Sequence, residues 1–252
     1  AVEKRSKVKS RVIATALKQL MWQSSEIFIM SHEVPDLDSI GSALGIYRCA
    51  RHLGKDAYII EGANKSSIEY LMHRLLQKDE YRRAFIGGAQ ALDKLDRRSL
   101  LVVVDTHRPS FAEVPALIDR ADKVVVIDHH RRSTESIENP VLSYLEPYAS
   151  SASELVTEIV QYFDEQVQLD PLEADALLAG ITMDTKSFTF KTGVRTFEAA
   201  SYLRRKGADP TSIRHFLQDD MDAYNARAET VRSAVIIGPG IVMSECPEET
   251  PN

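Results

Sequence analysis

Residues 100–105 read LLVVVD, and residues 124–130 read VVVIDHH. In both stretches a run of apolar side chains ends at an aspartate, Asp105 in the first and Asp128 in the second. Continuous apolar runs of this length are typical of strands that are covered on both faces, as in parallel sheets. The two stretches therefore predict neighbouring parallel strands whose carboxyl ends carry Asp105, Asp128 and the histidines that follow Asp128.

The segments around these strands alternate between apolar runs and helical periodicity. Further strands are predicted at 26–30, 57–60 and 141–145. Helices are predicted at 7–22, 40–53, 151–165, 171–183, 195–206, 210–217 and 220–233, and residues 66–98 are expected to be mostly helical. This alternation predicts an α/β fold, a parallel sheet flanked by helices and followed by further helices. From residue 234 on, Gly-Pro-Gly between two apolar runs predicts a hairpin.

Composition narrows the class of protein. The 252 residues include 44% apolar and 27% charged residues, which is typical of a globular chain with one large or two modest domains. With 37 acidic and 31 basic residues, the net charge of −6 disfavours binding to long nucleic acids. The two cysteines, Cys49 and Cys246, form no C-x-x-C pattern, so a reducing, cytoplasmic compartment is expected. No apolar stretch approaches the ~20 residues that span a bilayer, so no membrane contact is expected.

Polar side chains of metal-binding type follow several of the predicted strands. His32, Asp36 and Asp38 follow the first strand, and Asp184 interrupts an apolar helical stretch. In open α/β sheets, ligands collect beyond the carboxyl ends of the strands, so these groups are expected to converge. The candidate metal ligands are His32, Asp36, Asp38, Asp105, His129 and Asp184.

This set of side chains favours a two-metal site. Carboxylate and imidazole without thiolate suit manganese, and six ligands exceed what one ion with open positions uses. A carboxylate that bridges two ions about 3.5–4 Å apart would clamp an in-line displacement at phosphorus. Asp105 is the expected bridge, and a hydroxide held between the ions is the expected nucleophile.

Each of these residues also has a purely structural alternative. Asp38 or Ser39 would then cap the helix that follows, and Asp184 would face solvent. Asp105 and Asp128 would be capping or loop residues at strand ends. His107, two residues beyond Asp105, receives no assigned role.

The combined pattern resembles a known family. His32-x-x-x-Asp36-x-Asp38, V-V-D at Asp105, Asp128-His129-His130 and Asp184 are similar in order and spacing to the four motifs of the DHH phosphoesterase superfamily, over residues 6–233. Within it, residues 3–20 and 137–163 look most like the DHH domain of GdpP-type cyclic di-AMP phosphodiesterases.

The resemblance implies a manganese-dependent phosphodiesterase that converts cyclic di-AMP to linear pApA. It implies that His32, Asp36 and Asp105 hold one ion and that Asp38, Asp105, His129 and Asp184 hold the other, with magnesium or cobalt as substitutes. It places His130 at the scissile phosphate, and Asp128 is expected to orient a ligand imidazole. Asp105, Asp128 and His130 are thus the expected catalytic residues.

Two further features are candidates for substrate binding. Ser150, Ser151 and Ser153 open a helix, where N–H groups and hydroxyls would receive a phosphate; the alternative is helix capping. Arg195 would bind a phosphate with two hydrogen bonds; the alternative is an ordinary surface arginine.

The chain also departs from the family pattern. It lacks the G-G-G-H motif of the DHHA1 domain, so residues 1–233 are expected to form the DHH domain and residues 234–252 the start of a truncated DHHA1 domain. Both ends look like the cut ends of a larger protein. By the resemblance, the parent is expected to be anchored in a membrane with this domain in the cytoplasm, and a homodimer is expected.

Two other functions remain open from the sequence. One is a nanoRNase or exonuclease-type hydrolase of short linear oligonucleotides. The other is a catalytically silent nucleotide-binding sensor module, although a sensor has no need of all six ligands.

Overall fold

The predicted strands form one sheet in the larger of two compact units, Ala1–Phe216 and Leu217–Asn252. The structure is a computed structural model that describes residues 2–62, 66–217 and 221–245. The strand order is β3-β2-β1-β4-β5-β6, and all neighbouring strands are parallel. The strands are β1 (Glu26–Met30), β2 (Asp56–Glu61), β3 (Phe85–Gly87), β4 (Leu100–Val104), β5 (Val124–Asp128) and β6 (Leu142–Leu145). The order reverses between β1 and β4, which is where doubly wound folds bind ligands.

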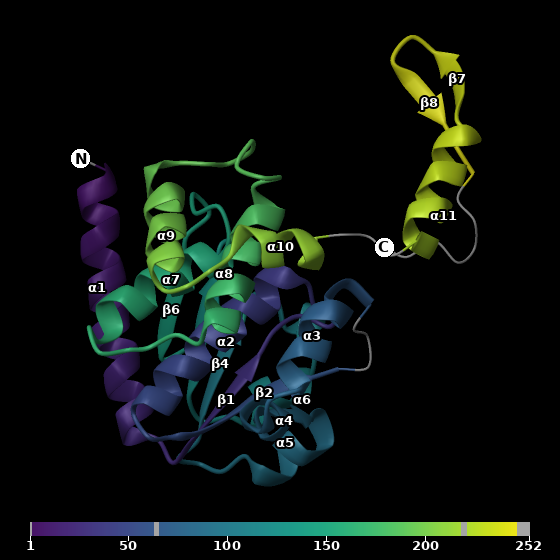
Figure 1. Ribbon diagram of the computed structural model, residues 1–252. Coiled ribbons are helices and arrows are strands. Elements are labelled where there is room, and N and C mark those ends of the chain that lie inside the picture. The colour runs from purple at the N-terminus through teal and green to yellow at the C-terminus, as the bar shows by residue number, and fades with distance from the viewer. Residues whose placement is uncertain (1, 63–65, 218–220, 246–252) are drawn as a thin grey trace. The chain divides into compact units, whose positions relative to one another are not determined.

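Helices cover both faces of this sheet (Figure 1). They are α1 (Val2–Gln23), α2 (Leu37–His52), α3 (Glu69–Leu76), α4 (Asp79–Ala84), α5 (Gly88–Lys94), α6 (Pro115–Arg120), α7 (Ala152–Phe163), α8 (Pro171–Asp184), α9 (Val194–Arg205) and α10 (Pro210–Phe216). Phe28 and Met30 of β1 point to the face where α5 and α6 pack. Helices α1, α2 and α7 pack against the other face, so the central strands are buried on both sides. The expected α/β class is confirmed.

Beyond shifts of one or two residues, three details differ from the sequence-based expectations. Helix α1 begins at Val2, five residues before the expected start at residue 7. Strand β3 lies inside the segment expected to be mostly helical; its three residues pair with the end of β2 and are too short to show a periodicity. Helix α2 begins at Leu37, three residues before the expected start. It is capped by Asp36, whose Oδ1 accepts a 2.9 Å hydrogen bond from the Ser39 N–H, so neither Asp38 nor Ser39 is the N-cap.

The smaller unit is a helix followed by a hairpin. Helix α11 (Met221–Arg232) leads into strands β7 (Val235–Gly238) and β8 (Ile241–Met243), which pair antiparallel. The predicted hairpin is therefore confirmed, with Gly240 in the left-handed conformation that its turn requires. Residues 246–252 of the predicted DHHA1 start lie outside the described residues, and the assignment of 234–252 to that domain stays a prediction. Among the described helices, none has the length and apolar character needed to cross a bilayer.

Candidate metal centre

Five of the six predicted metal ligands line a cavity at the carboxyl ends of β1, β4 and β5, and the sixth, Asp38, is buried beside it. The cavity has a volume of about 650 Å³. Its walls include ligands from four separate parts of the chain, namely His32 and Asp36 after β1, Asp105 after β4, His129 after β5, and Asp184 at the end of α8. The reversal of strand order between β1 and β4 creates this crevice, as expected for an open parallel sheet.

A first group of ligands forms around His32. Its Nε2 atom lies 3.2 Å from Asp105 Oδ2 and 3.9 Å from Asp36 Oδ1. Backbone hydrogen bonds fix the loop that carries this histidine, because the Glu33 N–H donates to Phe111 O (2.8 Å) and the Glu113 N–H donates to Ser31 O (3.0 Å). The three ligand atoms lie close enough together to share one ion.

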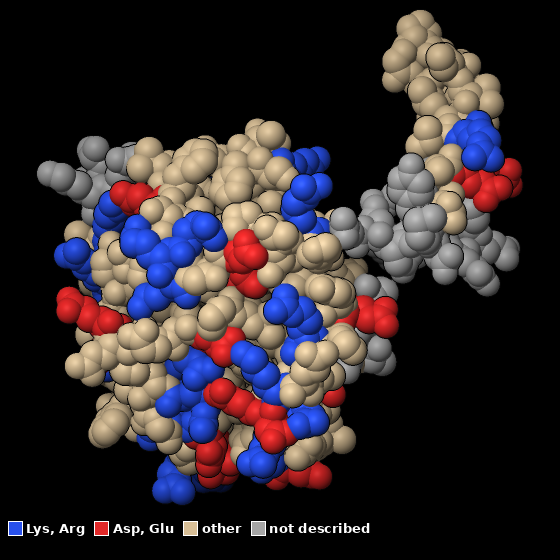
Figure 2. All heavy atoms as spheres, in the orientation of Figure 1, with Lys and Arg blue, Asp and Glu red and all other residues tan. Residues whose placement is uncertain are grey.

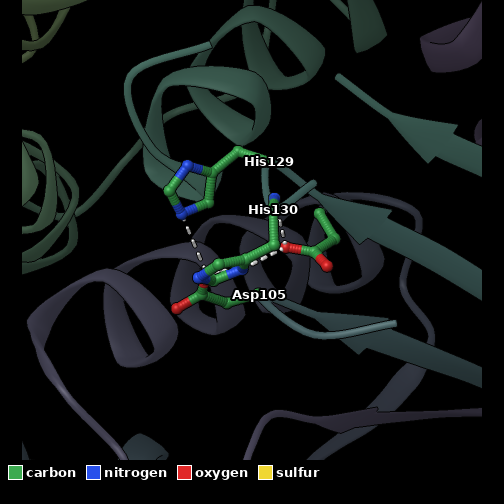
Figure 3. Close-up of side chains that lie close together, drawn as sticks. Asp105, His129 and His130 are labelled. Carbon is green, nitrogen blue, oxygen red and sulfur yellow. Dashed lines mark hydrogen bonds and ion pairs between the residues drawn. The ribbon is translucent and has the colours of Figure 1, made fainter. Parts of the chain in front are cut away.

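A second group of ligands forms around His129. Its Nε2 atom lies 3.2 Å from Asp184 Oδ2, 3.4 Å from Asp105 Oδ1 and 3.7 Å from Asp38 Oδ2. Figure 3 shows the imidazole of His129 pointing toward the carboxylate of Asp105. Asp105 thus presents one oxygen to each group, which is the arrangement that a bridging carboxylate requires.

The backbone at Asp105 is unusual. Its φ of 59° lies in the left-handed region, which aspartate and asparagine enter more easily than other non-glycine residues. The Asp105 N–H still donates to Ile127 O of β5 at 2.9 Å, so the residue is held at the end of the sheet. Its Oδ1 atom is buried, and no hydrogen bond from the described residues reaches it. A buried carboxylate oxygen without a donor is suited to a cation.

Mutual repulsion and burial perturb the acids of the site. Burial and the neighbouring Asp105 carboxylate raise the pKa of Asp38, and burial raises the pKa of Asp184 to about 6. Burial lowers the pKa of His129, but Asp105 and Asp38 outweigh it and bring the value to about 9. Cations would relieve this concentration of negative charge, and a set of carboxylates and imidazoles without thiolate suits divalent metals. The side chains present therefore fit metal ions.

Helix α7 supports the site through Asp38. Asp38 Oδ2 accepts from the Ala152 N–H and Oδ1 from the Ser153 N–H, both at 2.7 Å. The N-terminal end of a helix favours a negative charge, so α7 stabilises the carboxylate form of Asp38.

The three serines of this segment are buried and have structural partners. Ser151 caps α7 by accepting from the Glu154 N–H at 3.0 Å, and the Ser150 hydroxyl donates to Glu154 Oε2 at 2.6 Å. The Ser153 hydroxyl donates to the backbone oxygen of Asp38. The structure thus matches the capping alternative: the N–H groups offered to a phosphate hold Asp38, and none of the three serines lines the cavity.

Arg195 also lies outside the residues that line this cavity. Its guanidinium donates two hydrogen bonds of 2.8 Å to the Glu158 carboxylate and one of 3.3 Å to Tyr144 Oη. The side chain is only 13% exposed. The structure therefore gives Arg195 a buried ion pair, which neither sequence-based alternative anticipated.

Asp128 joins two histidines on one wall of the cavity. Its Oδ1 lies 2.7 Å from His130 Nδ1, and its Oδ2 lies 2.5 Å from His107 Nδ1. His107 Nε2 accepts from the Ser133 N–H, so Nδ1 is the ring nitrogen that donates to Asp128. Burial favours the neutral acid, but the hydrogen bonds from His130 and His107 hold the pKa of Asp128 at about 2.

This arrangement corrects one expectation and adds one residue. Asp128 was expected to orient a ligand imidazole, but the imidazoles it contacts belong to His130 and His107 rather than to the ligand-type His129. The added residue is His107, which is buried and to which the sequence alone assigns no role. Its signal is its place three residues after the end of β4, on the same edge of the sheet as the ligands.

Comparison with known proteins agrees with the fold and the motifs. The family model described as "DHH family, N-terminal domain" matches residues 26–181. An exopolyphosphatase-related protein from Bacteroides fragilis has a similar solved structure, with a TM-score of 0.72 at 17% identity over 89% of this chain and 66% of that one. At that identity the likeness concerns the fold.

Relatives of known name show much higher sequence identity. The cyclic-di-AMP phosphodiesterase GdpP of Bacillus subtilis is 44% identical over 98% of this chain and 38% of its own length. The cyclic-di-AMP phosphodiesterase PdeA of Listeria monocytogenes is 43% identical over 96% of this chain and 37% of its own length. The chain thus spans less than two fifths of these relatives. A third relative, the bifunctional oligoribonuclease and PAP phosphatase NrnA of Thermus thermophilus, is 28% identical over 99% of this chain and 71% of its own length.

With a family model that covers more than half of its residues and four motifs that meet in one cavity, the chain belongs to the DHH family.

Proposed function

We propose that this chain is the hydrolytic part of a metal-dependent phosphodiesterase that opens cyclic di-AMP to linear pApA. The observation that carries the proposal is the convergence of six ligand side chains: His32, Asp36, Asp105, His129 and Asp184 line one cavity, and the buried Asp38 lies beside His129 and Asp184. The names of the relatives that are 43–44% identical supply the substrate.

The two groups of ligands described above would each hold one divalent ion, which we propose to be manganese. His32, Asp36 and Asp105 would hold one, and Asp38, Asp105, His129 and Asp184 the other. When bound, the ions would supply a water of lowered pKa as the nucleophile and would stabilise negative charge that develops at phosphorus. Magnesium or cobalt are the proposed substitutes.

We place the side chain of His130 against the scissile phosphate. It is 56% exposed at the cavity, and its Nδ1 is held by Asp128, so the ring presents Nε2 to a ligand. The hydrogen bond with Asp128 raises the pKa of His130, which favours the imidazolium that donates to a phosphate oxygen. His107 holds the second oxygen of Asp128 and so limits the movement of the carboxylate.

In the net reaction, water adds across one phosphorus–oxygen bond. The 3′ oxygen leaves with a proton, and the linear product carries one 5′ phosphate. The cavity wall made by Asp128 and His130 would orient the phosphate for this displacement.

A substrate panel tests the proposal. The purified chain with manganese is incubated with cyclic di-AMP, pApA and pyrophosphate, and products are separated by chromatography. We expect pApA from cyclic di-AMP, abolished by EDTA and restored by manganese. Binding of cyclic di-AMP without any product, at full metal occupancy, would instead support the sensor module and overturn the proposal.

A second candidate function is the hydrolysis of short linear oligonucleotides. It is favoured by the relative from Thermus thermophilus, whose name states oligoribonuclease activity. Faster release of AMP from pApA than of pApA from cyclic di-AMP would favour this function over the first.

Three further proposals concern the context of the chain. We propose that residues 234–252 begin a DHHA1 domain, that the parent protein is membrane-anchored with this domain in the cytoplasm, and that the chain forms a homodimer. Proteolysis of a longer natural protein, its fractionation with membranes and light scattering of the purified chain test them in turn.

A further inference from the structure

We propose that a groove beside the metal centre is a second subsite, which holds the phosphate and the base of the dinucleotide that are not being cleaved. The inference rests on the proposed function and assigns to the substrate a site that the metal ligands do not touch. The groove has a volume of about 670 Å³. Its lining includes Arg131, Arg132, Tyr148 and Lys191.

The groove is continuous with the metal centre. Arg131 and Lys191 line both cavities, so the two spaces meet across these side chains. Arg131 directly follows His130, the residue placed at the scissile phosphate. A ligand longer than one nucleotide that occupies the metal centre would therefore extend past Arg131 into the groove.

The charge of the groove selects an anion. Its lining contains three cationic side chains and no carboxylate. Within the described part of the chain, no ion pair or side-chain hydrogen bond is recorded for Arg131, Arg132 or Lys191. Arg108, which lines only the metal-centre cavity, differs because it pairs with Glu135.

This local excess of positive charge contrasts with the molecule as a whole. The net charge is −6, and on the face drawn in Figure 2 basic and acidic side chains are interspersed. Unpaired arginines in a concave site suit a phosphate, because the guanidinium binds phosphate oxygens through two parallel hydrogen bonds.

An aromatic side chain supplies a surface for a base. Tyr148 is 94% exposed, which is unusual for a ring of this size, and it lies in the groove with Arg132 and Pro147. Bases stack on exposed aromatic rings with little regard to their identity. A nucleotide requires both cations for its phosphate and, next to them, a ring for its base. A lone inorganic phosphate would not use the ring.

Arg132 and Tyr148 provide the test because they line the groove but not the metal-centre cavity. Hydrolysis by the parent, Arg132→Ala and Tyr148→Ala is measured with cyclic di-AMP and with bis(p-nitrophenyl) phosphate, which has one phosphate and no base. For cyclic di-AMP we expect each substitution to raise KM by about tenfold, as loss of one stacking or charge-assisted contact implies. For the small diester we expect changes of less than about twofold, because it needs the metal centre alone.

Matched variants separate the subsite from general effects. Tyr148→Phe keeps the ring and is expected to restore the parent KM. Arg205→Ala removes a surface arginine whose one side-chain hydrogen bond within the described residues goes to Ser201 of the same helix, and it is expected to leave the hydrolysis of both substrates unchanged. Equal KM values for parent, Arg132→Ala and Tyr148→Ala, or an equal loss with both substrates, would overturn the subsite.

Binding without turnover distinguishes failure of the subsite from failure of the proposed function. Cyclic di-AMP is titrated by calorimetry into each protein in EDTA. Weaker binding by Arg132→Ala and Tyr148→Ala supports the subsite even if the parent hydrolyses no cyclic di-AMP. The absence of hydrolysis would overturn only the proposed function. Binding of equal strength by all three proteins would overturn the subsite even where hydrolysis is found.

Discussion

Gly180 of α8 packs directly against Asp38 of α2. A Cβ atom at position 180 would lie 2.7 Å from the Cα of Asp38, closer than real side chains come. A second close approach lies about one turn away along the same two helices. There a Cβ atom at Gly41 of α2 would lie 2.6 Å from the backbone oxygen of Ala176 in α8. These contacts bring the start of α2 to the end of α8, so that Asp38 and Asp184 both face His129.

The first prediction is that Gly180→Ala forces the two helices apart. Overpacking of this kind costs about 1–3 kcal/mol of unfolding free energy, and the shift separates Asp38 from Asp184. We expect a lower midpoint in urea and weaker manganese binding in calorimetry. Gly87→Ala is the control, because a Cβ atom there meets nothing within 4 Å. Unchanged manganese affinity in Gly180→Ala would contradict the positioning role of the glycine.

The second prediction concerns Asp105→Asn. Asparagine tolerates the left-handed backbone at this position, so the fold is expected to survive. Loss of the shared carboxylate removes a ligand from both groups, and hydrolysis should fall by at least about 10³-fold, by analogy with the loss of a group that stabilises charge in the transition state. The metal content after dialysis measures the loss of the ligand, and the rate with cyclic di-AMP measures the loss of hydrolysis.

The control is Asp56→Asn, which alters a surface carboxylate that is 72% exposed. It is expected to match the parent in metal content and rate. Hydrolysis by Asp105→Asn at the parent rate would show that the carboxylate does not bridge two ions.

Much of the fold and of the ligand set was predictable from the sequence because the signals are local. Two apolar runs that end in aspartate mark strand ends, and a parallel sheet brings its carboxyl ends to one edge. That the six predicted ligands lie together in the structure follows from this geometry.

The features that the sequence does not reveal depend on contacts between distant segments. The Asp38 carboxylate takes the N–H groups of Ala152 and Ser153, more than a hundred residues away, so these groups are not available to a phosphate. The Glu158 partner of Arg195 and the Asp128 partner of His107 are likewise set by packing between elements. Such partners have no signature in residue spacing, whereas the short strand β3 was missed because three residues show no periodicity.

The third prediction is that Asp128→Asn lowers activity without emptying the metal site. The substitution removes the negative charge that holds His130 Nδ1 at 2.7 Å, so the imidazole loses its orientation and its raised pKa. Carboxylates that orient imidazoles are worth about 10–100-fold in activity. We expect a loss of that size in kcat, with manganese content unchanged by elemental analysis.

A shift in the pH profile distinguishes this role from a structural one. If His130 acts as an imidazolium, kcat of the parent declines at high pH, and the decline begins at lower pH in Asp128→Asn. A profile of the same shape in both proteins would contradict the link between Asp128 and His130.

The fourth prediction is that Arg195→Ala affects stability rather than catalysis. Removal of the guanidinium leaves the buried Glu158 without its cationic partner, which costs about 3–5 kcal/mol for a buried pair. We expect a lower melting temperature and a parent-like rate per folded molecule. Arg205→Ala, on the exposed side of the same helix, should melt like the parent. A raised KM with unchanged stability would instead support phosphate binding by Arg195.

The fifth prediction is that metal affinity rises with pH. In the metal-free chain the pKa of His129 is raised to about 9, so its imidazole is protonated at neutral pH and must lose that proton before Nε2 can bind an ion. Loss of this proton is therefore expected to increase the affinity by about tenfold per pH unit between pH 6 and 9, and this contribution levels off above pH 9. Below pH 6 the decrease becomes steeper, because Asp184, whose pKa is raised to about 6, also takes up a proton.

Calorimetry at pH 7.5 in buffers of different ionisation enthalpy should show that at least about one proton is released per chain when the ions bind. An affinity that is constant from pH 6 to 9 would contradict the role of His129 as a ligand, because its imidazole must lose a proton in this range before it can bind an ion.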